Sequence, residues 1–294
     1  MVRPPRVFRG RRPVRPPRQG GLTLNKMLPN ILTLLALSAG MTGMRFGIQG
    51  RWEEAVVSIL IAAVLDALDG RIARLLNAQS KFGAELDSLS DVISFGVAPA
   101  MILYMWVLDE ARSFGWIAAV LFGVCAALRL ARFNTALGVE KPAWAFNYFT
   151  GVPAPAGAGL ALLPLIASFE VGPTVFGHPV FVTAWTVGIA ALMISAIPTY
   201  SLKGVRIPRA YVVFVLVGVG LLAAGVVSAP WTTFTVIAIV YLASFPFSIR
   251  QYHRLKSEAE RLQAAEEPPA AHPADPAAGT PPAPTPSPAA PPAP

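Results

Sequence analysis

Residues 66–91 read DALDGRIARLLNAQSKFGAELDSLSD and place four aspartates in a stretch that otherwise has the composition of two membrane spans. A polar turn interrupts the apolar pattern, so we predict a helical hairpin. Asp66 and Asp69 are three residues apart, and Asp87 and Asp91 are four apart, so each pair shares one helix face. Folding the hairpin sets Asp66 level with Asp91 and Asp69 level with Asp87.

This carboxylate cluster needs a physical reason, because each ionisable group inside a span costs about 2.5–3.5 kcal/mol on insertion scales. Salt bridges to Arg71 and Arg74 are too few to neutralise four aspartates. The two levels of the hairpin are separated by roughly 5 Å, close to the spacing of about 3.5–4 Å in two-metal sites. Hard oxygen ligands suit Mg²⁺ or Mn²⁺ better than zinc. We therefore predict a two-ion site.

The composition of the whole chain agrees with a membrane protein. Of its 294 residues, 54% are hydrophobic and 14% are charged, with a mean hydropathy of +0.54, whereas a soluble domain carries about 25% charged residues. The formal charge of +8 points to anionic lipid headgroups rather than nucleic acid, for which no recognition motif is visible. A single cysteine excludes a disulfide framework and a cysteine-based zinc site.

Eight apolar stretches are long enough to cross a bilayer core of about 30 Å as helices. We therefore predict an all-α, polytopic membrane helix bundle, with the fifth span the least well bounded because it is short and contains proline. The predicted spans are 27–48, 53–76, 83–107, 114–136, 151–168, 179–200, 209–228 and 231–249.

The basic residues predict the orientation of these spans. With both termini in the cytoplasm, 21 of the 24 Lys and Arg residues fall on the cytoplasmic side, and only Arg45, Arg51 and Arg112 fall outside. This asymmetry obeys the positive-inside rule. We expect a multi-pass protein of the cytoplasmic (inner) membrane whose active site faces the cytoplasm.

Two tails flank the predicted membrane domain at 27–256. Residues 1–26 alternate arginine with proline, and residues 257–294 are rich in proline and alanine. Neither composition can bury a core, so we expect both tails to be cytoplasmic and disordered.

Small and basic residues surround the aspartates in a way that suits a phosphorylated ligand. Gly70, Ala73 and Gly83 allow a backbone or a bulky ligand to approach closely. Arg74 follows Gly70 by one turn and can reach a phosphate with its forked donors. Together with the carboxylates, these residues indicate a lipid substrate that carries a pyrophosphate.

The pattern Asp66-x2-Asp69-Gly70-x2-Ala73-Arg74-x8-Gly83-x3-Asp87-x3-Asp91 resembles the signature of the CDP-alcohol phosphatidyltransferases at every fixed position. Three further segments resemble the phosphatidylserine synthase branch of that family, and the opening PNILTLLAL at 29–37 is also similar. These segments are LDSLSDVISFGVAPA at 86–100, ALRLARFN at 127–134 and FTGVPAPAGA at 149–158.

The resemblance implies a role for each motif residue. Asp66, Asp69 and Asp87 would bind the divalent ions, and Asp91 would lie near the metal and act as general base. The site for CDP-diacylglycerol would be formed by Asp66, Gly70, Ala73, Arg74 and Gly83. By this resemblance, the hydroxyl of L-serine attacks the lipid-side phosphorus, CMP leaves, and the enzyme is a homodimer.

Each of five further residues has two possible interpretations, one functional and one structural. Arg129, Arg132 and Asn134 are candidates for binding serine, but basic residues at a cytoplasmic helix end are also expected from topology alone. Asn30 and Thr33 lie one turn apart, and they either contact the nucleotide of CDP-diacylglycerol or form hydrogen bonds between helices.

Other functions remain as alternatives. The motif aspartates do not distinguish serine from glycerol 3-phosphate, inositol phosphate or choline as the acceptor of a sibling transferase. A divalent-cation transporter would spread its acids through the membrane depth, whereas these lie in one hairpin. A degenerate scaffold is disfavoured because every motif aspartate is present.

Overall fold

The computed structural model describes residues 24–135, 148–195, 197–200, 208 and 211–266. The predicted tail 1–26 lies almost wholly outside the described residues, as does the tail 257–294 beyond Glu266. The first elements are α1 (Leu24–Ile48), α2 (Trp52–Leu75), α3 (Lys81–Asp91), the π-helix η1 (Val92–Val97), α4 (Ala98–Trp106), the 3-10 helix η2 (Leu108–Ala111) and α5 (Arg112–Thr135). They are followed by β1 (Tyr148–Thr150), α6 (Ala154–Ala161), α7 (Leu163–Val171), α8 (Pro173–Phe176), α9 (Pro179–Ile194), β2 (Pro198–Tyr200), α10 (Val212–Ser228) and α11 (Pro230–Glu266).

The prediction of a polytopic membrane helix bundle is confirmed. Within the described residues, five helical segments are long and apolar enough to cross a membrane, and α9 and α10 are shorter apolar helices. α2 is also long, but it carries the charged residues of the motif. Each of the eight predicted spans therefore corresponds to a helical segment. The five long segments are Met27–Ile48, Lys81–Trp106, Leu108–Thr135, Ala154–Val171 and Pro230–Gln251.

The third predicted span is a continuous run of three helical types rather than one α-helix. Pro99 has no N–H, so it cannot form the α-helical bond to the carbonyl of Phe95. The chain instead forms η1, and the N–H of Ala98 donates to the carbonyl of Ile93, five residues earlier. This π-helix follows Asp91 directly and sets the register between the motif aspartates and the buried helix α4.

The fifth predicted span is divided between α6 and α7. Pro164 cannot donate to the carbonyl of Leu160 as an α-helix requires. The Leu160 carbonyl accepts a hydrogen bond of 2.8 Å from Trp185 Nε1 in α9 instead. A neighbouring helix thus satisfies the backbone group that the proline leaves free, as membrane helices require.

The sixth span was predicted over 179–200, but the helix that corresponds to it, α9, ends at Ile194. Pro198 disfavours helical backbone in the residue before it. Residues 198–200 instead form β2, which pairs antiparallel with β1 and aligns Phe149 with Thr199. This two-stranded ribbon is an exception to the all-helical prediction. It lies outside the spanning helices and ties the segment before α6 to the segment after α9.

The last helix continues beyond the predicted start of the C-terminal tail. α11 runs to Glu266, because residues 257–266 contain no proline and consist mainly of helix-forming Ala, Glu, Leu, Gln and Arg. The chain divides after Tyr252 into two compact units. The first unit contains α1 to α10 and the part of α11 that ends at Tyr252.

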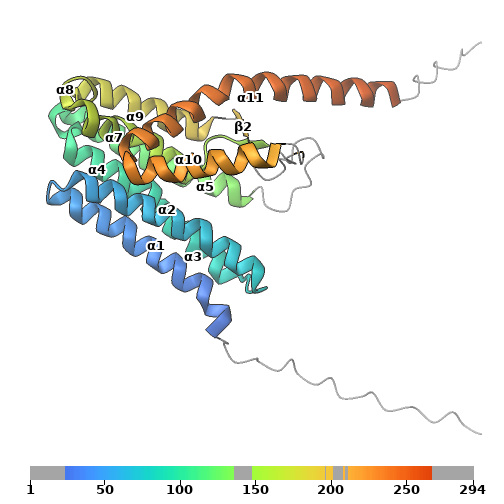
Figure 1. The fold of residues 1–294 in the computed structure, drawn as a ribbon, viewed down its shortest axis with the longest axis horizontal. Helices are drawn as coiled ribbons and strands as arrows, with labels where there is room; N and C mark the ends of the chain where they lie inside the picture. The colour runs from blue at the N-terminus through green and yellow to red at the C-terminus, as the bar shows by residue number, and fades with distance from the viewer. Residues whose placement is uncertain (1–23, 136–147, 196, 201–207, 209–210, 267–294) are drawn as a thin grey trace, which may run out of the picture. The chain divides into compact units, whose positions relative to one another are not determined.

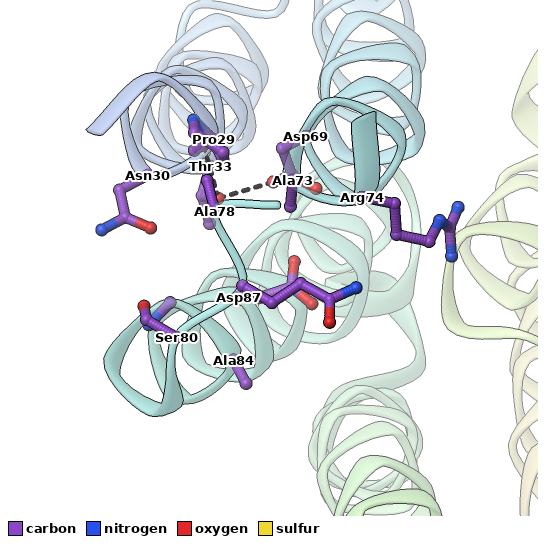
Figure 2. Close-up of a pocket in the computed structure, with 13 residues that line it drawn as sticks. Pro29, Asn30, Thr33, Asp69, Ala73, Arg74, Ala78, Ser80, Ala84 and Asp87 are labelled. Carbon is purple, nitrogen blue, oxygen red and sulfur yellow. Dashed lines mark hydrogen bonds between the residues drawn. The ribbon is translucent and has the colours of Figure 1, made fainter. Parts of the chain in front are cut away.

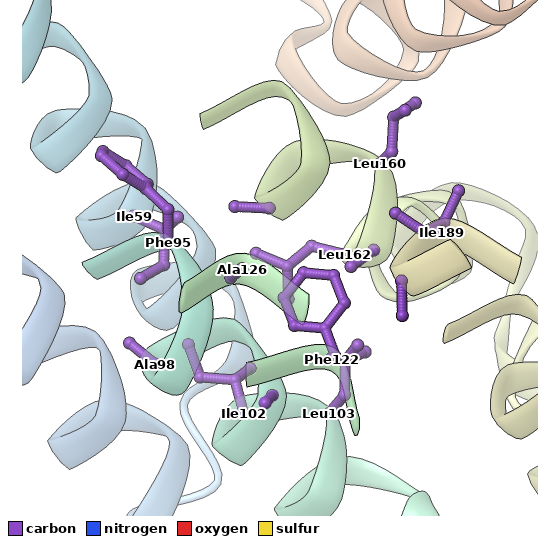
Figure 3. Packing of buried hydrophobic residues seen from close by; sticks show 14 of the residues in the cluster. Ile59, Phe95, Ala98, Ile102, Leu103, Phe122, Ala126, Leu160, Leu162 and Ile189 are labelled. Atoms are coloured by element: carbon purple, nitrogen blue, oxygen red, sulfur yellow. The ribbon is translucent and has the colours of Figure 1, made fainter. Parts of the chain in front are cut away.

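The core of the first unit lies where α5 meets η1, α4, α6 and α9. Phe122 of α5 and Phe95 of η1 are completely enclosed, and Leu103 and Leu162 complete the layer around Phe122 (Figure 3). Burying each large apolar side chain is worth about 1.5–3 kcal/mol in water, but inside a bilayer close packing supplies the stabilisation instead.

Helix α1 packs closely along α2 and beside α3 (Figure 1), and it also contacts η1. Glycines on α1 permit this approach. A Cβ at Gly40 would lie 2.7 Å from Ser94 Oγ, and one at Gly43 would lie 3.1 Å from the Ala55 carbonyl oxygen. These small residues bring α1 close to α2, which carries Asp66 and Asp69, and to η1, which follows Asp91 directly.

Candidate active site

The turn between α2 and α3 brings the two acidic helix faces together. Ser80 is the N-cap of α3, and its hydroxyl accepts a hydrogen bond of 2.9 Å from the N–H of Gly83. Asp66, Asp69 and Asp87 each offer a carboxylate oxygen within 4.8 Å of the others. Asp69 is buried, and Asp66 and Asp87 are half-buried.

Asp91 joins this cluster from the deeper end of α3. Its carboxyl lies within hydrogen-bonding reach of Asp66, and Asp87 interacts electrostatically with both Asp69 and Asp66. These contacts agree with the pairing predicted from the sequence, in which Asp66 lies level with Asp91 and Asp69 lies level with Asp87. Among the described residues, the salt bridge joins Arg51 to Glu54 at the opposite end of α2, and no Lys or Arg forms a salt bridge with the four aspartates.

The cluster borders a cavity of about 350 Å³ between α1, α2 and α3 (Figure 2). Asp69 and Asp87 line its wall, whereas Asp66 and Asp91 are not among the lining residues. The other sequence-predicted residues that line the cavity are Asn30, Thr33, Gly70, Ala73, Arg74 and Gly83. Six residues predicted to bind a CDP-lipid thus lie around one space beside two acidic side chains.

The two motif glycines have different surroundings. A Cβ at Gly70 would meet no atom within 4 Å, so this backbone faces open space in the cavity. A Cβ at Gly83 would lie 2.9 Å from Asn30 Oδ1 and 3.1 Å from Ser80 Oγ. Gly83 therefore permits close packing of α3 against α1, and Gly70 leaves room for a ligand.

Thr33 connects α1 to the acidic cluster. Its buried hydroxyl lies 2.6 Å from Asp69 Oδ2 and 3.1 Å from the carbonyl oxygen of Pro29 (Figure 2). Of the two readings of Thr33, the hydrogen bond between helices is present, and the side chain also lines the cavity. Asn30 lines the cavity beside Gly83.

The three serine-site candidates lie at the end of α5 in different surroundings. Arg129 is half-buried, its Nε has no hydrogen-bond partner, and its guanidinium interacts electrostatically with Asp91 and Tyr241. Arg132 donates a hydrogen bond of 2.6 Å to the Ile194 carbonyl at the end of α9. Asn134 donates a bond of 2.9 Å to Ser88 Oγ on α3. Among these contacts, only that of Arg129 is with a motif aspartate, Asp91.

Several polar residues near the site were not singled out in the sequence. Gln79 and Ser80 line the cavity from the turn. Ser90 donates to the Thr33 carbonyl at 3.2 Å, and Ser94 donates to the Ala36 carbonyl at 3.4 Å. The spacing of Ser90 and Ser94 places them on one helix face, a signal of helix pairing that could have been recognised.

The donor set fits a divalent cation. Two carboxylates 4 Å apart repel by about 4 kcal/mol at an effective dielectric constant of 20, and no Lys or Arg among the described residues forms a salt bridge with the aspartates. The buried Oδ1 of Asp87 also has no hydrogen-bond partner. Such an orphaned carboxylate oxygen is a ligand position that a hard cation would satisfy, so the three close aspartates could hold a metal ion.

Fold and site together define a polytopic membrane protein with a carboxylate-lined cavity between α1, α2 and α3. The family model for CDP-alcohol phosphatidyltransferase matches residues 26–197, and a second one, for CDP-alcohol phosphatidyltransferase 2, matches residues 210–246. The chain belongs to the CDP-alcohol phosphatidyltransferase family.

Relatives within this family carry more specific names. The chain is 39% identical to a CDP-diacylglycerol–serine O-phosphatidyltransferase of Mycobacterium tuberculosis, over 80% of this chain and 82% of the relative. It is 39% identical to the protein of that name from Mycobacterium leprae, over 80% and 78% of the two chains. An archaetidylserine synthase of Methanothermobacter thermautotrophicus is 36% identical over 58% of this chain and 68% of the relative.

Proposed function

We propose that this protein transfers the phosphatidyl group of CDP-diacylglycerol to the hydroxyl of L-serine and releases CMP. The observation that carries the proposal is the cavity in which Asp69 and Asp87 lie beside Gly70 and Arg74. Membership of the family and the shared name of the mycobacterial relatives support the choice of donor and acceptor. The catalytic domain in this proposal comprises residues 27–256.

The cavity binds the CDP end of the lipid in this proposal. Arg74 contacts the pyrophosphate, because a guanidinium donates two parallel hydrogen bonds to phosphate oxygens. The open space over Gly70 admits the nucleotide, and Asn30, Thr33, Ala73 and Gly83 complete the wall.

The metal ions in this proposal are Mg²⁺ or Mn²⁺ in a two-ion site. Asp66, Asp69, Asp87 and Asp91 would hold them, because hard cations prefer carboxylate oxygens. When bound, such ions stabilise negative charge on the attacking and leaving oxygens of a displacement at phosphorus. The hydrogen bond from Thr33 holds the Asp69 carboxylate in place for this role.

Asp91 is the general base of the proposed reaction. It removes the proton from the serine hydroxyl while the oxygen forms a bond to the lipid-side phosphorus. The bond from that phosphorus to the CMP oxygen breaks, and CMP leaves with the electron pair. Asp91 suits this role because its carboxyl reaches Asp66 of the acidic cluster and interacts electrostatically with Arg129, the proposed serine contact.

The serine site comprises Arg129, Arg132 and Asn134 in this proposal. Arg129 binds the serine carboxylate, because its Nε has no partner and its guanidinium lies near Asp91. Arg132 and Asn134 shape the site through their bonds to Ile194 and Ser88. The proposed location is the cytoplasmic membrane with the site and both termini on the cytoplasmic side, and the proposed assembly is a homodimer, as the family resemblance implies.

The reaction is tested with the full-length protein in detergent, CDP-diacylglycerol and either Mg²⁺ or Mn²⁺. We expect CMP release to depend on serine and not on glycerol 3-phosphate, inositol phosphate or choline. Turnover without serine, or preference for another acceptor, would show that the acceptor assignment is wrong.

A matched pair of variants tests the base. Asp91→Asn is expected to lower the rate by roughly 10²–10⁴-fold, the usual contribution of general-base catalysis. Asp109→Asn is the control, because Asp109 accepts a hydrogen bond from Tyr104 on the surface and lies outside the site. Near-normal turnover by Asp91→Asn would remove Asp91 from the mechanism.

A further inference from the structure

A second cavity, of about 750 Å³, lies between α10 and α11. Its lining is almost entirely apolar, with Leu221 of α10 and Val236 and Val240 of α11 among the wall residues. The residues that α11 contributes recur at helical spacing from Thr232 to Ser244, so they form one continuous face of the helix. The space is therefore an elongated groove.

The two walls of the groove are held differently. α11 is fixed to the bundle by buried Phe245 and by the edge-to-face contact of Trp231 with Phe169, whose ring centroids are 4.8 Å apart. No residue of α10 is buried. The helices approach each other closely where a Cβ at Gly225 would lie 2.8 Å from Thr233 Oγ1, and both residues line the groove near the turn between the helices.

The length of the groove indicates the kind of molecule that fits it. Twelve residues separate Thr232 from Ser244 on α11, which corresponds to about 18 Å along the helix axis. One leaflet of a bilayer core is roughly 15 Å thick. A long, flexible hydrocarbon chain matches these dimensions and this lining, whereas a compact polar ligand does not.

The other end of the groove leads toward the acidic cluster. Tyr241 lines the groove and interacts electrostatically with Arg129, which in turn interacts with Asp91. Tyr241 is ten residues from the end of its span at Gln251, and Asp91 is ten residues from the start of its span at Lys81. Both therefore lie about 15 Å along their helices from ends that the predicted topology places on the same side of the membrane.

We propose that this groove binds one acyl chain of the diacylglycerol lipid whose headgroup reacts at the acidic cluster. The ester end of the chain lies near Tyr241, and the methyl end lies near Gly225 and Thr233. The inference rests on the proposed function for the identity of the headgroup. It adds a binding site for the lipid tail in helices that contribute no residue to the catalytic cavity.

Two tryptophan variants test the site with CDP-diacylglycerols of different chain length. Val236 lines the groove and is 53% exposed, and Ile239 is 54% exposed on the same helix but does not line it. Val236→Trp should raise the KM for dipalmitoyl CDP-diacylglycerol by about tenfold or more, since filling the groove displaces many methylenes. The KM values for the dihexanoyl lipid and for serine should stay unchanged, and Ile239→Trp should alter none of them. An equal effect of Val236→Trp on both lipids, or no effect, would overturn the proposal.

A photolabel gives a readout that does not require turnover. The probe is CDP-diacylglycerol with a diazirine at the end of one acyl chain, added to the full chain without serine. Adducts are expected on peptides around Gly225 and Thr233, and they should be lost in Val236→Trp and kept in Ile239→Trp. If the protein forms these adducts but does not release CMP in response to serine, the proposed reaction is wrong and the groove is supported. Adducts elsewhere, or a disulfide between two copies of the Val236→Cys variant, would refute the groove.

Discussion

Thr33 shows how a single hydroxyl can organise the acidic cluster. It lies within 2.6 Å of an Asp69 oxygen across two helices, in a buried position where an unpaired carboxylate oxygen would be costly. Partners of this kind orient the carboxylates that ligate a metal. Thr33 thus acts on the site through Asp69.

Thr33→Val is expected to weaken Mn²⁺ binding by about 10–100-fold, the usual effect of losing a partner of a metal ligand. Thr33→Ser keeps the hydroxyl and should retain most of the affinity. Thr42→Val is a second control, because the Thr42 hydroxyl on the same helix donates to the Ser38 carbonyl of its own helix. Electron paramagnetic resonance titration of free Mn²⁺ measures the affinity without turnover. Equal affinity of the valine and serine variants at position 33 would contradict the role.

Arg129 and Arg132 are three residues apart, yet their contacts differ. Arg132 is occupied by the Ile194 carbonyl, whereas Arg129 has a free Nε and faces Asp91. Arg129→Lys should therefore raise the KM for serine by roughly tenfold or more, because lysine cannot form the forked pair with a carboxylate. The KM for CDP-diacylglycerol should change little. Steady-state kinetics with each substrate varied measures the split, and equal changes for both substrates would exclude the serine contact.

At the scale of elements, the junction between η2 and α5 depends on one glycine. A Cβ at Gly115 would overlap the carbonyl oxygen of Leu108, a residue that is completely buried. The backbone of η2 can approach α5 this closely only because position 115 has no side chain. This contact orients α5, which carries Arg129.

Gly115→Ala is expected to destabilise the protein by about 1–3 kcal/mol, the usual cost of overpacking. Gly123→Ala on the same helix meets no atom within 4 Å, so it should be neutral or stabilise by up to about 1 kcal/mol. The thermal unfolding midpoint in detergent measures both effects. A midpoint for Gly115→Ala equal to that of Gly123→Ala would show that the junction adjusts without cost.

At the scale of the whole molecule, the distribution of basic residues predicts which side of the membrane carries the cavity. Gln49 follows α1 and Lys81 begins α3, so the two positions lie at opposite ends of the first helices. Both side chains are exposed, and the single native cysteine, Cys125, is buried. These features allow a direct labelling experiment.

Lys81→Cys should react with a membrane-impermeant maleimide only after the membrane is opened, and Gln49→Cys should react in intact cells. The reason is that the Lys81 turn belongs to the side with 21 of the 24 basic residues. Mass shift on a denaturing gel measures the labelling. The reverse pattern would place the cavity on the outer side.

Much of the architecture could be predicted from the sequence, because hydropathy and the helical period are local properties of the chain. The eight helical segments and the matched depths of the four aspartates follow from these properties. The third and fifth spans were predicted as simple helices, since Pro99 and Pro164 act through hydrogen bonds whose new partners cannot be read locally. The end of α9 and the short β-ribbon were missed because pairing between distant segments carries no local period.

The sequence by itself determined a membrane helix bundle with a carboxylate hairpin, because burying four acids in an apolar stretch has few explanations other than a cation site. Only the tertiary structure decided which partner each side chain has. In the folded protein Thr33 bonds to Asp69, and Arg132 bonds to the Ile194 carbonyl whereas Arg129 does not. The groove between α10 and α11 also exists only in the folded protein. The physical reason is that these contacts join residues far apart in the chain, and packing between helices selects them.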